Sequence, residues 1–164
     1  MEKGFIICVD DEPTVVSTLR EQLLRYFGET HEIEIATSGE EAWEMIQDIV
    51  QNGGSVEVII TDQVMPGLKG DELLEKVNAI LPDTIKILLT GQAGLQDTID
   101  AINKGGLNYF IEKPWDVEEL HSHIERLIQK YKENVENHRL LRKLEKRVQE
   151  LESLLKEKSL YEED

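Results

Sequence analysis

The chain alternates between short apolar runs and longer stretches in which apolar residues recur at helical spacing. The runs are rich in β-branched residues and cover residues 4–9, 31–36, 56–61, 84–89 and 107–111. Strands that alternate with helices of this length pair in parallel, and the connecting helices cover both faces of the sheet. We therefore expect an α/β fold with a doubly wound parallel sheet of five strands and five helices.

Residues that start or stop helices punctuate the stretches between these runs. Pro13 suits the first turn of one helix, and Ser38 suits the N-cap of the next. A third helix is closed by Pro82, and a fourth covers about residues 95–103. Each stretch is long enough to cross over between parallel strands.

The last helix has no sequence signal that ends it. From Asp116, which we expect to be its N-cap, no Gly or Pro occurs through Asp164. Its apolar residues follow a heptad-like spacing with one change of register. A helix of this length needs a partner for its apolar stripe. We expect a compact domain over residues 1–127 and a coiled-coil stalk over 128–164 that forms a parallel homodimer; a frayed tail is the alternative.

Polar residues stand where four of the five runs end. Asp10 and Asp11 follow the first run, Asp62 the third, Thr90 the fourth and Lys113 the fifth. The carboxyl ends of parallel strands converge on one edge of the sheet, where ligands bind. These residues are therefore expected to form one site.

The residue types at this edge favour phosphoryl chemistry with a divalent cation. Three carboxylates repel one another unless a cation lies among them, and oxygen ligands of this kind suit Mg²⁺. An exposed Asp62 carboxylate beside the cation is a competent nucleophile for a phosphoryl group. Thr90 can donate its hydroxyl and Lys113 its charge to the phosphoryl oxygens. Asp11 alternatively caps the following helix.

Charge and hydropathy exclude several classes of function. The net charge is −16, and residues 1–125 carry 8 Lys and Arg against 25 Asp and Glu. Such a body repels phosphate backbones, so we expect no direct nucleic-acid binding, whereas cations and basic protein surfaces remain possible partners. No apolar run reaches membrane-spanning length. The lone Cys8 lies in a strand-like run, which suits a core position and a reducing cytoplasm.

The motifs at the strand ends resemble those of response-regulator receiver domains, the family typified by the chemotaxis response regulator. The resemblance covers about residues 3–127 and rests on residues 9–13 (VDDEP), 61–67 (TDQVMPG), 89–91 (LTG) and 112–115 (EKPW). It implies a flavodoxin-like sheet with strand order 2-1-3-4-5. It also implies a signalling switch rather than a turnover enzyme, with self-catalysed phosphotransfer and slow autodephosphorylation.

The resemblance further implies a partner and a metal. Asp62 would accept phosphate from the histidine of a sensor kinase or phosphotransfer protein. Mg²⁺ would be bound by Asp11, by Asp62, by the backbone carbonyl of Val64 and, largely through water, by Asp10.

The same resemblance assigns a conformational switch. Thr90 and Phe110 would be the pair that moves inward when Asp62 is phosphorylated, although Phe110 alternatively is only a buried core aromatic. The peptide bond from Lys113 to Pro114 would be cis. Signal output would leave through the fourth helix, the fifth strand and the fifth helix, toward a C-terminal effector outside this chain or through the stalk as a stand-alone adaptor.

Two neutral residues near the expected phosphorylation site suggest a long-lived phosphoryl state. Val64 and Gln92 each lie two residues after a site residue, Asp62 and Thr90, beside the expected path of a hydrolytic water. We therefore predict slow dephosphorylation.

Three other functions are weaker. A haloacid-dehalogenase-type phosphatase needs a second Asp two residues after a nucleophile at Asp10, and Glu12 stands there. His138 as a phosphoacceptor lacks the acid and proline that follow such histidines, and His31, His121 and His123 are expected at the surface. A degenerate receiver used only for dimerisation would not need the complete set of acids, Thr and Lys.

Overall fold

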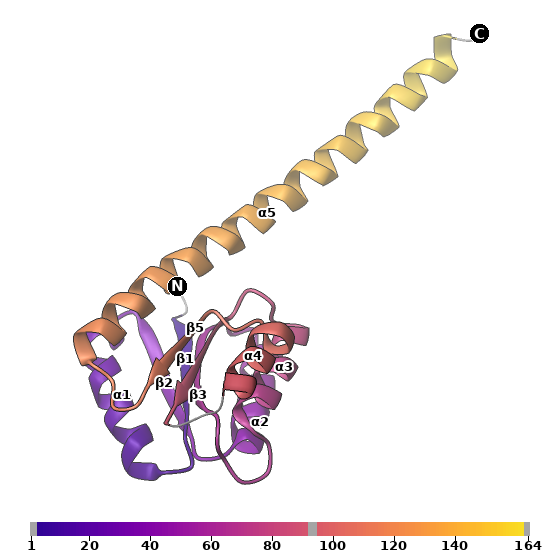
Figure 1. The fold of residues 1–164 in the computed structure, drawn as a ribbon. Helices are drawn as coiled ribbons and strands as arrows, with labels where there is room; N and C mark the ends of the chain where they lie inside the picture. Colours follow the sequence, from indigo (N-terminus) through magenta and orange to yellow (C-terminus); the bar gives the residue numbers. More distant parts are fainter. Residues whose placement is uncertain (1–2, 92–94, 163–164) are drawn as a thin grey trace. The chain divides into compact units, whose positions relative to one another are not determined.

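The computed structural model describes residues 3–91 and 95–162. Within these residues, five parallel strands form one sheet in the order β2-β1-β3-β4-β5 (Figure 1). This order confirms the predicted flavodoxin-like, doubly wound α/β fold. The strands are β1 Gly4–Val9, β2 His31–Ala36, β3 Val56–Asp62, β4 Ile85–Thr90 and β5 Tyr109–Glu112.

Five helices in the same residues follow the strands, as predicted, and their N-termini carry the expected signals. Pro13 stands in the first turn of its helix. The Ser38 hydroxyl accepts a hydrogen bond from the Glu41 N–H at 3.1 Å. Asp116 accepts from two backbone N–H groups of the last helix, at 2.9 and 3.1 Å. The helices are α1 Pro13–Phe27, α2 Gly39–Gln51, α3 Gly70–Ile80, α4 Leu95–Gly105 and α5 Val117–Glu162.

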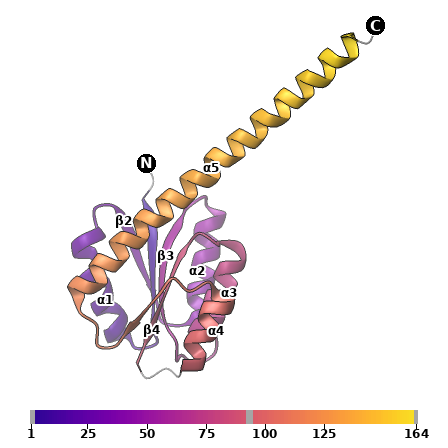
Figure 2. The same ribbon diagram turned by 45° about the horizontal axis from the view of Figure 1, so that its top comes forward.

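Apolar side chains on the two faces of the sheet form two cores. Side chains of α1 and the first turns of α5 pack on one face, against residues such as Ile6 and Ile60. Side chains of α2 and α3 pack on the other face, against Ile7 and Ile59. Helix α4 lies beside α3 (Figure 2). Adjacent residues of each central strand thus face opposite cores, which explains why these strands are continuous apolar runs.

The last two strands differ from the prediction by one or two residues. β4 includes Thr90, and β5 begins at Tyr109 instead of Leu107. Before β5 starts, the Asn108 amide side chain accepts a hydrogen bond from the Lys86 N–H at 2.8 Å, and the Asn108 N–H donates to the Lys86 carbonyl, also at 2.8 Å. This side-chain contact replaces ladder pairing there, so the strand begins later than its apolar run.

His31 is buried, so the expectation of a surface position was wrong. Its Nε2 lies 3.1 Å from the Glu57 carboxylate, and its Nδ1 lies 2.8 Å from the Thr30 hydroxyl. His31 stands opposite Gly4 in the sheet, and a Cβ on Gly4 would collide with the Glu57 side chain. The missing side chain at Gly4 thus makes room for the pair. His121 and His123 are partly exposed and stack on Tyr26 and Tyr109.

The chain divides into two compact units, Met1–Tyr131 and Lys132–Asp164. In the first unit, Leu127 and Ile128 are still buried in the core. The described part of the second unit is helical through Glu162, and its heptad-spaced apolar side chains are exposed: Leu141, Leu144, Val148, Leu151 and Leu155. No described helix is both long and apolar enough to span a bilayer.

Candidate functional site

Three carboxylates gather at the carboxyl edge of the sheet. Asp10 follows β1 and Asp62 ends β3, and these two strands pair directly, with Val9 opposite Thr61. One oxygen from each of Asp10, Asp11 and Asp62 lies within 4.8 Å of the others. Asp10 is fully buried, whereas Asp11 is exposed. The parallel sheet therefore brings residues 10, 11 and 62 together, as the strand ends predict.

Lys113 joins two of these acids. Its ammonium donates hydrogen bonds to Asp10 Oδ2 at 2.8 Å and to Asp62 Oδ1 at 3.2 Å. The Lys113–Pro114 peptide bond that follows is cis, as predicted. The bond to Asp10 has the short length typical of strong charge-assisted hydrogen bonds, and the longer contact to Asp62 places the same cation beside both carboxylates.

The negative charges of the neighbouring acids shift the pKa values of Asp62 and Lys113. Burial raises the pKa of Asp62, and the neighbouring Asp10 raises it further, while Lys113 lowers it. Burial disfavours the charge on Lys113, but the hydrogen bond to Asp10 and the charges of both acids raise its pKa overall. A cation near the three acids would relieve their repulsion. Three hard carboxylate oxygens at this spacing fit Mg²⁺.

Asp11 does not cap the following helix, so that alternative was wrong. The N-cap of α1 is Glu12, which makes no side-chain capping bond. The Glu12 N–H instead donates to Asp10 Oδ1 at 2.9 Å. One Asp10 oxygen is thus used by the backbone and the other by Lys113, which leaves the exposed Asp11 carboxylate available to a ligand.

Thr90 and Phe110 lie in the neighbouring strands β4 and β5. The Thr90 hydroxyl donates to the Ile111 carbonyl at 3.4 Å. Phe110 stands opposite Leu88 in the sheet and is 46% exposed. The alternative that Phe110 is only a buried core aromatic was therefore wrong.

Sequence reasoning missed the residues that hold the loop after Asp62. Gln63, which is 2% exposed, donates its amide N–H to Asp71 Oδ1 and accepts the Asp71 backbone N–H, both at 2.9 Å. At Gly70, a Cβ would overlap the Asp62 carbonyl oxygen and lie 2.9 Å from Gln63 Cα. The sequence signal was a lone Gly at a helix start, which by itself reads as an ordinary cap.

Of the two residues expected to slow dephosphorylation, the structure describes only Val64. The Val64 side chain is 72% exposed in the loop after β3. Gln92 lies outside the described residues. Among the described residues, the Asp10, Asp11 and Asp62 group is the one cluster of acids, His or Cys close enough to hold a metal ion.

Known proteins resemble this chain in sequence and in fold. The family model of the response regulator receiver domain matches residues 6–125. A chemotaxis protein CheY homolog of Campylobacter jejuni is 33% identical over 75% of this chain and 91% of its own length. The hydrogenase transcriptional regulatory protein HoxA of Bradyrhizobium diazoefficiens is 28% identical over 79% of this chain, which spans only 25% of HoxA. A crystal structure of a receiver domain protein from Clostridium thermocellum is 29% identical, with a TM-score of 0.67 over 79% of this chain and 97% of that one.

Proposed function

This chain belongs to the response regulator receiver family, and from that premise we propose that it is a phosphorylation-activated switch with Asp62 as phosphoacceptor. The observation that carries the proposal is the group of Asp10, Asp11 and Asp62 with the Lys113 ammonium between two of them. The phosphoryl donor would be the histidine of a sensor kinase or phosphotransfer protein. The chain would act as a cytoplasmic signalling protein without substrate turnover.

The chemistry needs an in-line transfer with charge neutralisation. A carboxylate oxygen of Asp62 attacks the phosphorus, the P–N bond to the donor histidine breaks, and the departing imidazole takes up a proton. Lys113 neutralises charge on the phosphoryl oxygens, and Asp10 holds Lys113 in position. Asp11, Asp62 and the Val64 carbonyl would hold Mg²⁺, with Asp10 binding it largely through water, and the ion would offset the charge that accumulates during transfer.

The switch would arise from the new charge at Asp62. The phosphoryl oxygens attract the Thr90 hydroxyl, which in the present structure donates to the Ile111 carbonyl at 3.4 Å. Movement of Thr90 opens space into which the half-exposed Phe110 ring can turn. Such a movement changes the surface of α4, β5 and α5 and biases a two-state equilibrium.

The output would leave through α5. Residues 128–164 would form a stalk whose exposed apolar stripe pairs with a second copy. HoxA is named a transcriptional regulatory protein, and its length beyond the matched portion is consistent with an effector joined to such a stalk. A stand-alone adaptor is the alternative output.

Phosphorylation is tested with acetyl phosphate and Mg²⁺ on the full chain, followed by intact-protein mass spectrometry. We expect one phosphoryl group on the wild type, none on Asp62→Asn, and normal uptake by Asp48→Asn, a control that removes an exposed acid elsewhere. Uptake by Asp62→Asn would contradict the assignment. No uptake by the wild type, together with a failure to bind beryllofluoride, would favour a dimerisation scaffold without phosphorylation.

Dimerisation is tested by light scattering after size exclusion. Leu144→Asp places a charge in the stripe and should give a monomer. Gln149→Asp, at an exposed position outside the heptad-spaced set, is the matched control and should stay dimeric. Equal masses for all three proteins would contradict pairing through this stripe.

A further inference from the structure

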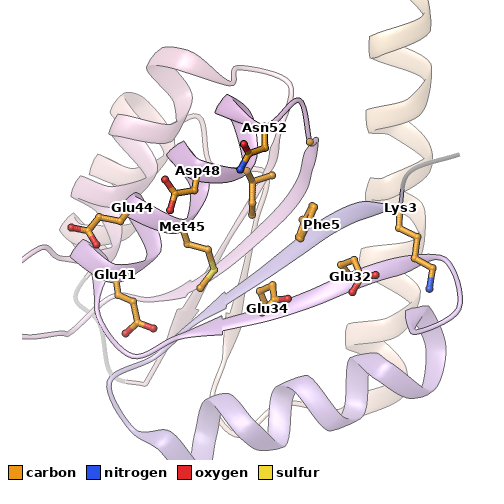
Figure 3. Close-up of a pocket in the computed structure, with 11 residues that line it drawn as sticks. Lys3, Phe5, Glu32, Glu34, Glu41, Glu44, Met45, Asp48 and Asn52 are labelled. Atoms are coloured by element: carbon orange, nitrogen blue, oxygen red, sulfur yellow. The ribbon is translucent and has the colours of Figure 1, made fainter.

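An open groove lies between helix α2 and the edge strand β2. Its volume is about 670 Å³, and Figure 3 shows its lining side chains converging from α2, β2 and the start of β1. The floor is apolar and formed by Phe5, Met45 and Ile49, each of which is partly exposed. Helix α2 therefore leaves part of this face of the sheet uncovered.

The alternation of β2 explains why the groove is open. Ile33 is buried in the core under α1 and α5, and Ile35 packs against it, so Glu32 and Glu34 must face the α2 side. An apolar residue at either position would extend the core beneath α2. Two exposed carboxylates stand there instead.

Acids line both sides of the apolar floor. Glu41, Glu44 and Asp48 are spaced three and four residues apart and so share one face of α2, opposite Glu32 and Glu34 on β2. Glu41 accepts hydrogen bonds from Thr37.

Four of the acids that line the groove have no basic side chain paired with them among the described residues. In the part of the chain that the structure describes, Glu32, Glu34, Glu44 and Asp48 form no ion pair. Lys3 is the one basic residue in the lining, and its ammonium lies 3.5 Å from the Gly28 carbonyl.

We propose that this groove docks a basic amphipathic helix of a partner protein. Such a helix lays its apolar side chains on Phe5, Met45 and Ile49, while Lys or Arg side chains on its flanks meet the two acidic sides. From Glu41 to Asn52 the α2 side is about 16 Å long, which matches about three turns of a partner helix. An apolar floor with two sides of one charge selects against acidic and uncharged helices.

The groove is separate from the phosphorylation site. The groove begins at Phe5 and Glu32, near the amino ends of β1 and β2, and its other end, at Glu41 in the first turn of α2, lies at the carboxyl edge where Asp62 ends β3. A strand of six residues is about 20 Å long. Asp10, Asp11, Asp62 and Lys113 are not among the residues that line the groove, so a docked helix leaves the Asp62 carboxylate accessible.

The test uses a fluorescein-labelled amphipathic helix of leucine and lysine, about 14 residues long. Its anisotropy is titrated with the full chain at about 0.15 M salt. We expect saturable binding that Glu32→Gln/Glu34→Gln weakens about tenfold, through lost charge pairs. Met45→Gln should weaken it by a similar factor through the lost apolar contact.

Two variants are controls. Glu21→Gln/Glu29→Gln removes the same charge from exposed positions outside the groove and should change the dissociation constant by less than about twofold. Asp62→Asn should bind the peptide as the wild type does, which separates this inference from the proposed function. Circular dichroism confirms that each variant is folded.

Three results would overturn the proposal. No saturable binding to the wild type is the first. Equal weakening in the two double variants is the second, because the attraction would then come from the net charge of −16 and not from the groove. The third is self-association of the chain that disappears in Glu32→Gln/Glu34→Gln, because a second copy would then occupy the groove.

Discussion

Lys86 is a buried lysine whose charge should make the stability of the fold depend on pH. Its side chain is 1% exposed, and its ammonium donates to the carbonyls of Thr84 at 2.7 Å and of Leu81 and Pro82 at 3.3 Å. Burial lowers its pKa to about 8, against the opposing charge of Asp83. These carbonyls belong to the loop between α3 and β4, so Lys86 holds that loop in place at an electrostatic cost.

The sign and size of the effect follow from the pKa. Between about pH 8 and pH 10.5 the unfolded chain keeps the Lys86 proton that the folded chain has released, so stability rises with pH in this window. Below about pH 8 Lys86 is protonated in both the folded and the unfolded chain, so the full cost of burying its charge lowers the free energy of unfolding. The shift corresponds to about 3 kcal/mol.

Urea unfolding of the wild type and Lys86→Met across this window measures the effect. The wild type should gain about 3 kcal/mol relative to Lys86→Met between pH 8 and pH 10.5. Lys104→Met, which removes an exposed lysine, should follow the wild type. A constant free-energy difference between the wild type and Lys86→Met would refute the reasoning.

Three further predictions concern the site. Gly70→Ala should destabilise the fold by about 1–3 kcal/mol and slow acetyl phosphate uptake, because its methyl group overlaps the Asp62 carbonyl; unchanged urea melts would contradict this. Lys113→Met should lower the free energy of unfolding by about 3 kcal/mol, because it leaves Asp10 buried without its cation. Mg²⁺ should then raise the Tm of this variant more than that of the wild type, because the ion replaces the missing positive charge. Equal Tm shifts would argue against a site in which Mg²⁺ and Lys113 neutralise the same acids. Val64→Asn should speed dephosphorylation of the phosphorylated chain, since an amide can orient water; an unchanged rate would defeat the idea of a long-lived phosphoryl state.

The sequence predicts those parts of the site that depend only on the order and direction of the strands. Asp10, Asp62 and Lys113 each follow an apolar run, and a parallel sheet must bring such positions to one edge. The closeness of these three side chains could thus be predicted without knowing any side-chain conformation.

The roles of other residues depend on what surrounds them in the folded chain, which the neighbouring sequence does not reveal. His31 is buried beside Glu57, whose side chain fills the space that a Cβ on Gly4 would occupy, and Lys86 reaches carbonyls of a loop that precedes its own strand. Gly70 matters because the Asp62 backbone passes close to it. In each case backbone or side chains outside the residue's own strand or helix decide its role.

The two edge strands of the sheet, β2 and β5, influence whether molecules of this protein associate at high concentration. β5 has only four residues, and β2 carries Glu32 and Glu34 and gives its Ile33 carbonyl to Arg20 at 3.1 Å. Short or charged edges resist strand-to-strand association between molecules. Near neutral pH the protein should therefore remain dispersed in concentrated solution. Close to its isoelectric point of about 4.6, where repulsion between molecules vanishes, the β2 edge should become the place where assembly into larger particles begins.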